Sequence, residues 1–174
     1  MGEAKVGDEF VTHEFDEAIA VQQVIVDAEA VLATSHPVAS TKRVIAAALT
    51  ADRAFLKELK AMGKEHGATG KVEDVAKGLK DLMEATLESA TKEGHDSDFY
   101  EAHAVLLTTV RKQMDSAAAM RKIGSDARDT KMRDAAAAMQ KALTASAKAL
   151  SAELGAYAVH IANETKVTKA ASAR

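Results

Sequence analysis

The residues best placed to carry chemistry are four polar side chains on otherwise apolar helical faces. Gln22 and Glu29 lie on one such face, and the same three- and four-residue steps pass through Asp52 and His103 in later segments. Burying a polar group without a partner is costly, so these side chains must contact one another or lie at the edges of their faces. Two interpretations stay open: a metal or proton-transfer site inside the fold, or a set of hydrogen bonds in its core.

His103 is predicted to be a buried, neutral, hydrogen-bonded residue and not a metal ligand. It lies four residues after Phe99 and three before Leu106, so it shares their helical face. Desolvation disfavours the charged imidazole, and the neutral ring still has one donor and one acceptor to satisfy. Asp52 or Glu29 on a neighbouring face is the expected partner.

A second arrangement suited to a metal pairs a histidine with a glutamate four residues later. His13 with Glu17 and His160 with Glu164 each place two ligands on one helix face. Together they would offer the nitrogen and oxygen donors that zinc accepts, while surface ion pairs near helix ends are the alternative interpretation. A di-iron site of the Glu-x-x-His type is not expected, since no histidine has an acidic residue three positions before it.

Other catalytic and nucleic-acid-binding features are missing from the sequence. The chain has no cysteine, no glycine-rich phosphate loop, no Gly-x-Ser-x-Gly and no His-Glu-x-x-His. Aromatic residues make up 3% and tryptophan is absent, which argues against a base-stacking surface for nucleic acids. The sequence therefore predicts a protein that is not an enzyme, has no catalytic residue and needs no cofactor, with metal binding as the alternative.

These residues are carried by five predicted helices in a chain of 174 residues that is rich in alanine, the best helix former. Pro37 ends the first helix, because proline cannot continue the hydrogen-bond ladder, and glycines end the next three. No strand-like alternation competes with the helical spacing. The expected helices span about 8–34, 38 or 40 to 66, 71–92, 98–124, and 125 or 126 to 163.

The fold class that follows is all-α: an antiparallel up-and-down bundle of four to five long amphipathic helices, ferritin-like in arrangement. A sustained three–four repeat is typical of bundle packing, and short connections favour antiparallel neighbours. Residues 8–164 are expected to form one domain, between a disordered N-terminus (1–7) and a flexible C-terminal tail (165–174). The expected core positions of the third helix are Val72, Val75, Leu79, Leu82 and Thr86.

Polar residues are expected to begin the last two helices, and the last helix is expected to outrun the others. Asp98 with Glu101 fits a capping box, and Ser125 or Asp126 would cap the fifth helix. That helix would be about 55 Å long against about 35–40 Å for its neighbours. Its overhanging apolar residues need cover, which predicts a homo-oligomer or a protein partner. These residues are Leu154, Tyr157 and Ile161.

Two stretches resemble a bacterial ferritin-like helical-bundle family of unknown function, whose members are often exported. One stretch runs from Ala48 to Met62 and the other from Gly94 to Met114. The family has an Asp-His pair in the first stretch and a later histidine in the second, where this chain has Arg53 and Arg111. The resemblance implies the fold, matches the family's polar positions only at Asp52, and removes most of any metal function.

The function expected from these observations is that of a non-enzymatic helical bundle, a structural, stress-related or assembly component that acts through its surface. The alternatives are a ferritin-like bundle that binds metal with carboxylates and histidine in its interior, and a four-helix module that senses a small ligand. No nucleic-acid partner and no transmembrane segment are expected. The expected location is the cytoplasm, or the periplasm or exterior if a signal peptide has been removed.

Overall fold

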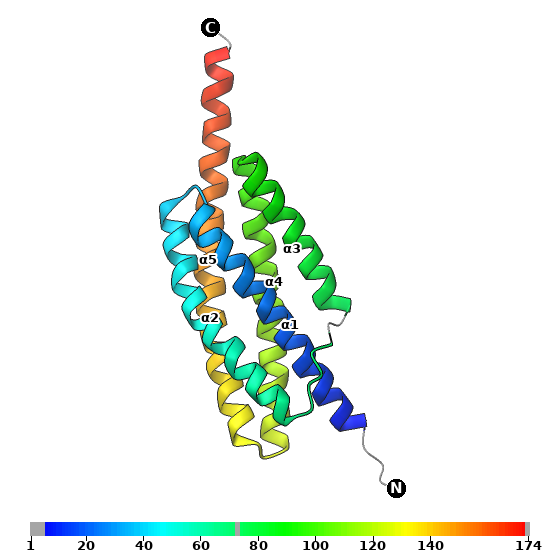
Figure 1. The fold of residues 1–174 in the computed structure, drawn as a ribbon. Helices are drawn as coiled ribbons and strands as arrows, with labels where there is room; N and C mark the ends of the chain where they lie inside the picture. Colours follow the sequence, from blue (N-terminus) through cyan, green and yellow to red (C-terminus); the bar gives the residue numbers. More distant parts are fainter. Residues whose placement is uncertain (1–5, 72–73, 173–174) are drawn as a thin grey trace.

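The computed structural model describes residues 6–71 and 74–172, and the side chains of 8–71 and 74–164. These ranges form helices joined by short connections and contain no strand (Figure 1), which confirms the all-α prediction. The helices are α1 (Val6–Ser35), α2 (Ala39–Glu65), α3 (Asp74–Glu93), α4 (Asp96–Asp126) and α5 (Thr130–Ser172).

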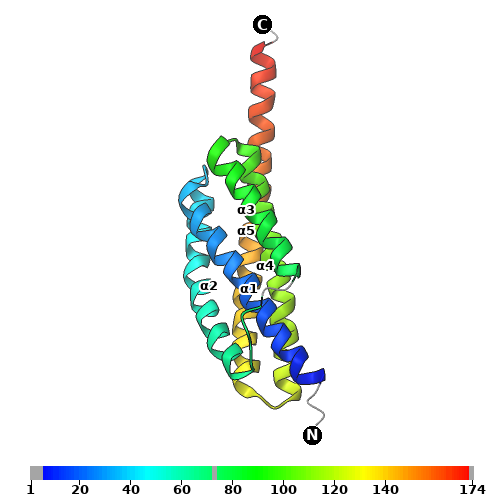
Figure 2. The same ribbon diagram turned by 45° about the vertical axis from the view of Figure 1, so that its right-hand side comes forward.

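Four of the helices surround a common core, and α3 covers one of its grooves. α1 contacts α2 and α4, and α5 contacts the same two helices, so these four close a ring (Figure 1 and Figure 2). Among the described residues, α3 contacts only α1 and α4. The bundle proper therefore has four members, and α3 is an outer helix laid against two of them.

The apolar faces of α1 and α4 that carry Gln22, Glu29 and His103 are buried. Phe15, Ile25 and Leu32 of α1 have no exposed surface, and neither do Leu106 and Val110 of α4. The apolar face of α5 is buried up to Leu150 and again at Tyr157. Its buried members are Met132, Ala136, Met139, Leu143, Leu150 and Tyr157.

The predicted face of α3 is wrong at Val75 and Leu82, while Leu79 and Thr86 are half-buried and Val72 lies outside the described residues. Val75 and Leu82 are 52% and 51% exposed, whereas the helix buries Ala76, Met83 and Ala90, which are spaced seven residues apart. The small side chains of the two alanines let the backbone of α3 come close to α1 and α4. Val75 and Leu82 consequently face outward, whereas Leu79 packs against the core.

The connection between α2 and α3 is fastened to α1 by a buried carboxylate. Asp16 is 4% exposed, and its Oδ1 accepts hydrogen bonds from the backbone N–H groups of Thr69 and Gly70, at 2.9 Å each. The Thr69 hydroxyl donates to Asp16 Oδ2 at 2.8 Å. These bonds satisfy two backbone N–H groups in the described part of the connection, residues 66–71, which is not helical.

The turn between α3 and α4 differs from the predicted capping box. Gly94 adopts φ +71°, a left-handed conformation that glycine reaches at little cost. His95 occupies the cap position of α4 without a side-chain cap bond. Asp98 instead lies inside the first turn, where its backbone N–H donates to the His95 carbonyl at 3.0 Å.

The helix-five caps predicted at Ser125 and Asp126 are also wrong, because α4 continues through both residues. Asp129 caps α5, with its Oδ1 accepting a hydrogen bond from the Met132 N–H at 2.9 Å. Gly124 allows this turn to close, because a Cβ placed there would lie 2.7 Å from the Arg133 nitrogen. The sequence signal at Gly124 therefore marks a close approach of two helices and not a helix end.

The last helix is longer than predicted. α5 contains 43 residues and continues to Ser172, past the expected end at residue 163. In Figure 1 its C-terminal part projects beyond the ends of the other helices. Of the residues predicted to overhang, Tyr157 is 2% exposed, and Leu154 and Ile161 are partly buried against the core, so the chain itself covers them. The projecting part begins near Tyr157, and Val159 within it is 60% exposed.

By length and composition, one helix in the described part of the chain is apolar enough to cross a membrane. It is the Asp8–Ser35 part of α1, with a mean hydropathy of 1.3. Half of that window is buried inside the bundle. The core helix of a bundle and a signal sequence meet the same criterion as a membrane span.

Candidate functional site

Three of the four predicted polar residues form one buried group between α1 and α2. Gln22 Nε2 donates to Asp52 Oδ1 at 2.9 Å and to the Asp52 carbonyl at 3.3 Å. Gln22 and Glu29 have no exposed surface, and Asp52 is 2% exposed. The prediction that these side chains meet one another therefore holds for Gln22 and Asp52.

Glu29 lies beside this pair as a neutral carboxylic acid. Neither of its oxygens has a well-formed hydrogen bond within the described residues. Burial, with the neighbouring Asp52 charge, raises the pKa of Glu29 to about 10. Burial also raises the pKa of Asp52, while the hydrogen bond from Gln22 opposes that rise. At neutral pH the interior thus holds the Glu29 proton rather than a second negative charge.

His103 is buried as predicted, but its partner is different. Its Nε2 lies 3.0 Å from the Leu150 carbonyl of α5 and not near Asp52 or Glu29. Because a carbonyl only accepts, Nε2 carries the proton of the neutral ring and Nδ1 holds a lone pair. Burial lowers the pKa of His103, which favours this neutral form.

His36 is a buried histidine that the sequence analysis did not single out. It has no exposed surface, and its Nδ1 accepts a hydrogen bond from the Val38 N–H at 3.1 Å. The proton of the neutral ring is therefore on Nε2. Burial, and secondarily the nearby His103, lowers the pKa of His36 to about 4. The available signal was spacing, since His36 follows Gln22 and Glu29 at seven-residue steps.

The two buried histidines present complementary unsatisfied atoms. His36 Nε2 is a donor and His103 Nδ1 an acceptor, and neither has a partner within the described residues. The ring centroids are 5.7 Å apart, at an interplanar angle of 82°. Tyr157 and Phe99 also pack against His36, with centroids at 4.9 and 5.7 Å. The two rings are therefore neutral, and between them they carry one donor and one acceptor without partners in the described structure.

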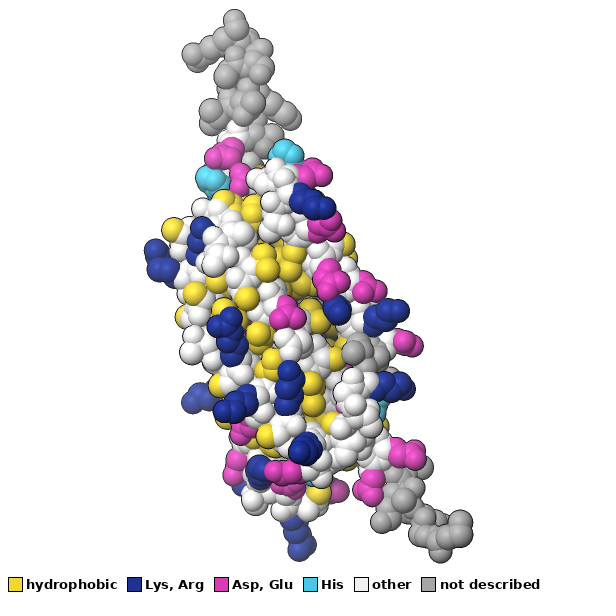
Figure 3. All heavy atoms as spheres, viewed as in Figure 1, with side chains coloured by type: hydrophobic (Ala, Val, Ile, Leu, Met, Phe, Trp, Pro, Cys, Tyr) yellow, Lys and Arg dark blue, Asp and Glu magenta, His cyan; other side chains and the backbone are white. Residues whose placement is uncertain are grey.

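A group of ligating atoms lies where α5 leaves the ring. Asp96, His160 and Glu164 each place one such atom within 4.8 Å of the others. His160 Nε2 is 3.3 Å from Glu164 Oε1, and the Tyr157 hydroxyl donates to Asp96 Oδ1 at 2.5 Å. Figure 3 shows histidine and acidic side chains gathered at this end of the molecule. We call these three residues the α4–α5 cluster.

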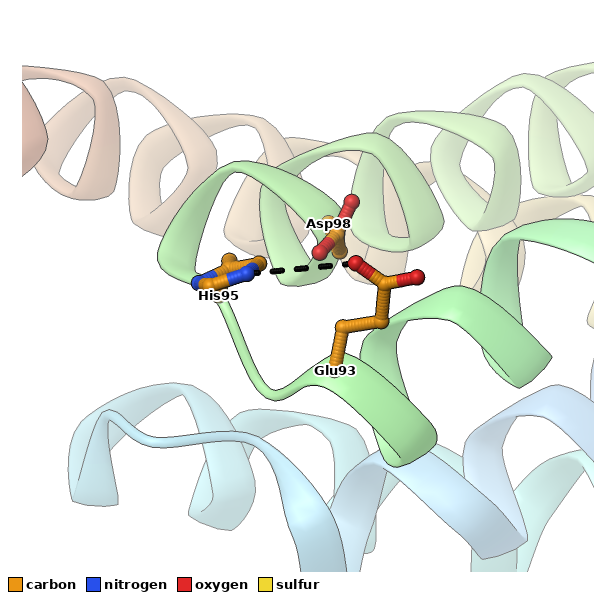
Figure 4. Close-up of side chains that lie close together, drawn as sticks. All are labelled: Glu93, His95 and Asp98. Atoms are coloured by element: carbon orange, nitrogen blue, oxygen red, sulfur yellow. Dashed lines mark ion pairs between the residues drawn. The ribbon is translucent and has the colours of Figure 1, made fainter.

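A second group occupies the adjoining turn, from the end of α3 to the first turn of α4 (Figure 4). It consists of Glu93, His95 and Asp98, whose ligating atoms also lie within 4.8 Å of one another. His95 Nε2 and Glu93 Oε2 are 3.9 Å apart, and both side chains are largely exposed. Asp98 Oδ2 is shielded from solvent and has no hydrogen-bond partner in the described part of the chain.

The four-ligand zinc site predicted from two His–Glu pairs does not form. His13 and Glu17 lie near the start of α1, and His160 and Glu164 lie in the projecting part of α5. These segments are at opposite ends of the molecule (Figure 1). Glu17 is instead 8% exposed and forms an ion pair with Lys112 of α4.

Comparison with known proteins found no relative of this chain. No family model, no curated protein and no solved structure matches this chain. The ferritin-like resemblance therefore rests on the sequence stretches alone, and any assignment of function has to come from the geometry of the chain itself.

Proposed function

We propose that this protein is a non-enzymatic helical bundle that acts through its surface as an assembly component, whether structural or stress-related. The observation that carries the proposal is the projection of α5 beyond the ring. A helix that leaves its bundle exposes the apolar residues that other helices would otherwise cover. Val159, 60% exposed in this region, is such a residue.

A shallow hollow beside the projecting helix supplies a surface for association. It measures about 260 Å³ and lies between the start of α4 and the C-terminal part of α5. Its walls combine an aromatic ring with small and aliphatic side chains, which allow close helix packing. The lining residues are Ser97, Tyr100, Glu101, Ala158, Ile161 and Ala162.

The occupant that we propose for this hollow is the projecting helix of a second copy of the chain. A two-fold pair uses the same patch on both subunits, and here one patch contains both the helix and the hollow that receives it. A homo-oligomer built in this way needs no further component. We also propose that neighbouring helices of the bundle are antiparallel, which their short connections support. The ferritin-like relationship and a cytoplasmic location are part of the same proposal.

Light scattering tests the proposal directly. We expect the wild-type chain to have a mass above that of one chain at micromolar concentration, and Ile161→Glu to reduce it to one chain. Val75→Glu is the matched control, because Val75 is exposed near the start of the outer helix α3, at the end of that helix away from the start of α4. A wild-type mass of one chain throughout the micromolar range would contradict the proposal.

A further inference from the structure

We propose that the α4–α5 cluster, Asp96, His160 and Glu164, binds one divalent transition-metal ion, and that zinc is its best match. This inference goes beyond the proposed assembly role and does not depend on it. The ligands come from two helices, with Asp96 at the start of α4 and the other two on α5. Zinc accepts imidazole nitrogen and carboxylate oxygen ligands, and its open sites combine three protein ligands with a water in the fourth position.

The distances suit such an ion. Metal–ligand bonds of about 2.0–2.2 Å in a tetrahedron put neighbouring ligand atoms about 3.3–3.6 Å apart. The His160 Nε2–Glu164 Oε1 distance is 3.3 Å, because the spacing of four residues places both side chains on one face of α5. The ligating atoms of all three residues lie within 4.8 Å, so small side-chain rotations bring the Asp96 carboxylate to bonding distance.

Tyr157 provides the outer support that metal ligands commonly have. Its hydroxyl donates to Asp96 Oδ1 and thereby fixes the carboxylate, leaving Oδ2 available to a metal. Its ring stacks on His160 with centroids 6.2 Å apart and an interplanar angle of 16°. Tyr157 is 2% exposed, so the support is anchored in the core.

The charge of the cluster also suits a cation, because two of its three residues are carboxylates. Asp96 and Glu164 each place a carboxylate oxygen within 4.8 Å of the other ligating atoms of the cluster, so two negative charges lie close together here. A bound divalent cation would neutralise that charge.

The adjoining turn group is the weaker alternative. Glu93 and His95 lie within one short segment, are 65% and 70% exposed, and are 3.9 Å apart. No buried side chain is hydrogen-bonded to them in the described structure. The α4–α5 cluster instead links two helices and has a buried tyrosine behind it. We therefore assign the ion to the α4–α5 cluster and use His95 as a discriminating position.

Isothermal titration of the metal-free full chain with zinc chloride tests the assignment. We expect one equivalent to bind, and His160→Gln and Glu164→Gln each to weaken binding at least 10-fold. Both side chains are more than half exposed, so the variants should fold, which circular dichroism checks. His13→Gln is the matched control, because His13 also precedes a glutamate by four residues, and it should leave binding unchanged.

A thermal melt provides a second readout. Zinc should raise the melting temperature of the wild-type chain by several degrees and leave that of His160→Gln unchanged, because only the folded state brings the ligands together. The assignment is overturned if zinc does not bind, if His95→Gln abolishes binding while His160→Gln does not, or if all the histidine variants weaken it equally. A monomeric chain that binds one zinc would overturn the proposed assembly while supporting this site.

Discussion

At the scale of single residues, the most consequential group is the Glu29 carboxyl, because it keeps a proton that the unfolded chain would release. Its pKa is about 10 in the folded protein against 4.5 for the ordinary group. Glu29 therefore leaves the free energy of unfolding at its full value below pH 4.5. Above that pH the free energy of unfolding falls as the pH rises toward 10, because only the folded state keeps the proton. At neutral pH the fold bears the cost of holding the proton.

Glu29→Gln should remove that cost. Glutamine has the same shape and no proton to take up, so we expect the free energy of unfolding to rise by about 1–3 kcal/mol at pH 8 and to change little at pH 4. Urea unfolding at the two pH values measures the difference. Asp27→Asn, at an exposed position on the same helix, should have little effect at either pH. Equal effects of Glu29→Gln at both pH values would show that the carboxyl is ionised in the fold.

The sequence identified Gln22, Glu29, Asp52 and His103 because each interrupts a regular apolar face. It missed His36, although His36 continues the seven-residue spacing of Gln22 and Glu29, because the first helix was expected to end before it, next to Pro37. Partners were harder to predict than burial. A hydrogen bond such as that from His103 to Leu150 depends on the axial register between α4 and α5, which side-chain packing sets and which sequence spacing does not encode.

At the scale of elements, the α4–α5 turn depends on the missing side chain of Gly124. Gly124→Ala would place a methyl group against the Arg133 and Asp129 backbone, at 2.7 and 3.0 Å. Backbone cannot move aside as a flexible side chain can, so we expect a loss of about 1–3 kcal/mol in unfolding free energy.

Gly78→Ala is the matched control, since a Cβ there meets no atom within 4 Å. Gly78 lies inside α3, where alanine should stabilise the helix by about 0.5–1 kcal/mol. Denaturant melts of both variants measure the two effects. If both variants changed the free energy of unfolding by similar amounts in the same direction, the close approach of Gly124 to the backbone of the next helix would not be what holds the turn.

The spacing of apolar residues predicted that the helices exist. For the outer helix α3 it did not predict which face is buried. Its large residues suggested one face, but the groove between α1 and α4 accepts the face that carries Ala76 and Ala90. Close approach depends on the shape of the groove, which exists only once the ring has formed. For the same reason the sequence found the His160–Glu164 pair within α5 but not Asp96, which α4 brings to it.

At the scale of the whole molecule, buried acids and buried histidines oppose each other in their effect on stability. His36 has a pKa of about 4 in the folded protein against 6.5 for the ordinary group. Its contribution to the free energy of unfolding is therefore complete above pH 6.5 and is lost as the pH falls toward 4. The lowered pKa of His103 acts in the same direction. Glu29 and Asp52 act in the opposite direction as the pH rises.

The free energy of unfolding should therefore be greatest on the mildly acidic side of neutrality, at about pH 4.5–6.5, and fall on both sides. Each uncompensated group contributes a slope of about 1.4 kcal/mol per pH unit. Urea unfolding in half-unit steps from pH 4 to pH 9 measures the profile, and Glu29→Gln should flatten its alkaline side. A maximum at pH 8 or above would contradict this balance.

The closed ring of α1, α2, α5 and α4 also has a consequence for how the chain reaches its fold. Two sides of the ring, α1 with α2 and α4 with α5, join helices that are consecutive in sequence, so each pair can form as a local hairpin. Only the other two sides require distant segments to meet. Local contacts of this kind are typical of fast-folding helical proteins. During synthesis the α1–α2 hairpin emerges first. The outer helix α3, which connects the two hairpins, can pack only after the α4–α5 hairpin has formed, because its groove lies between α1 and α4.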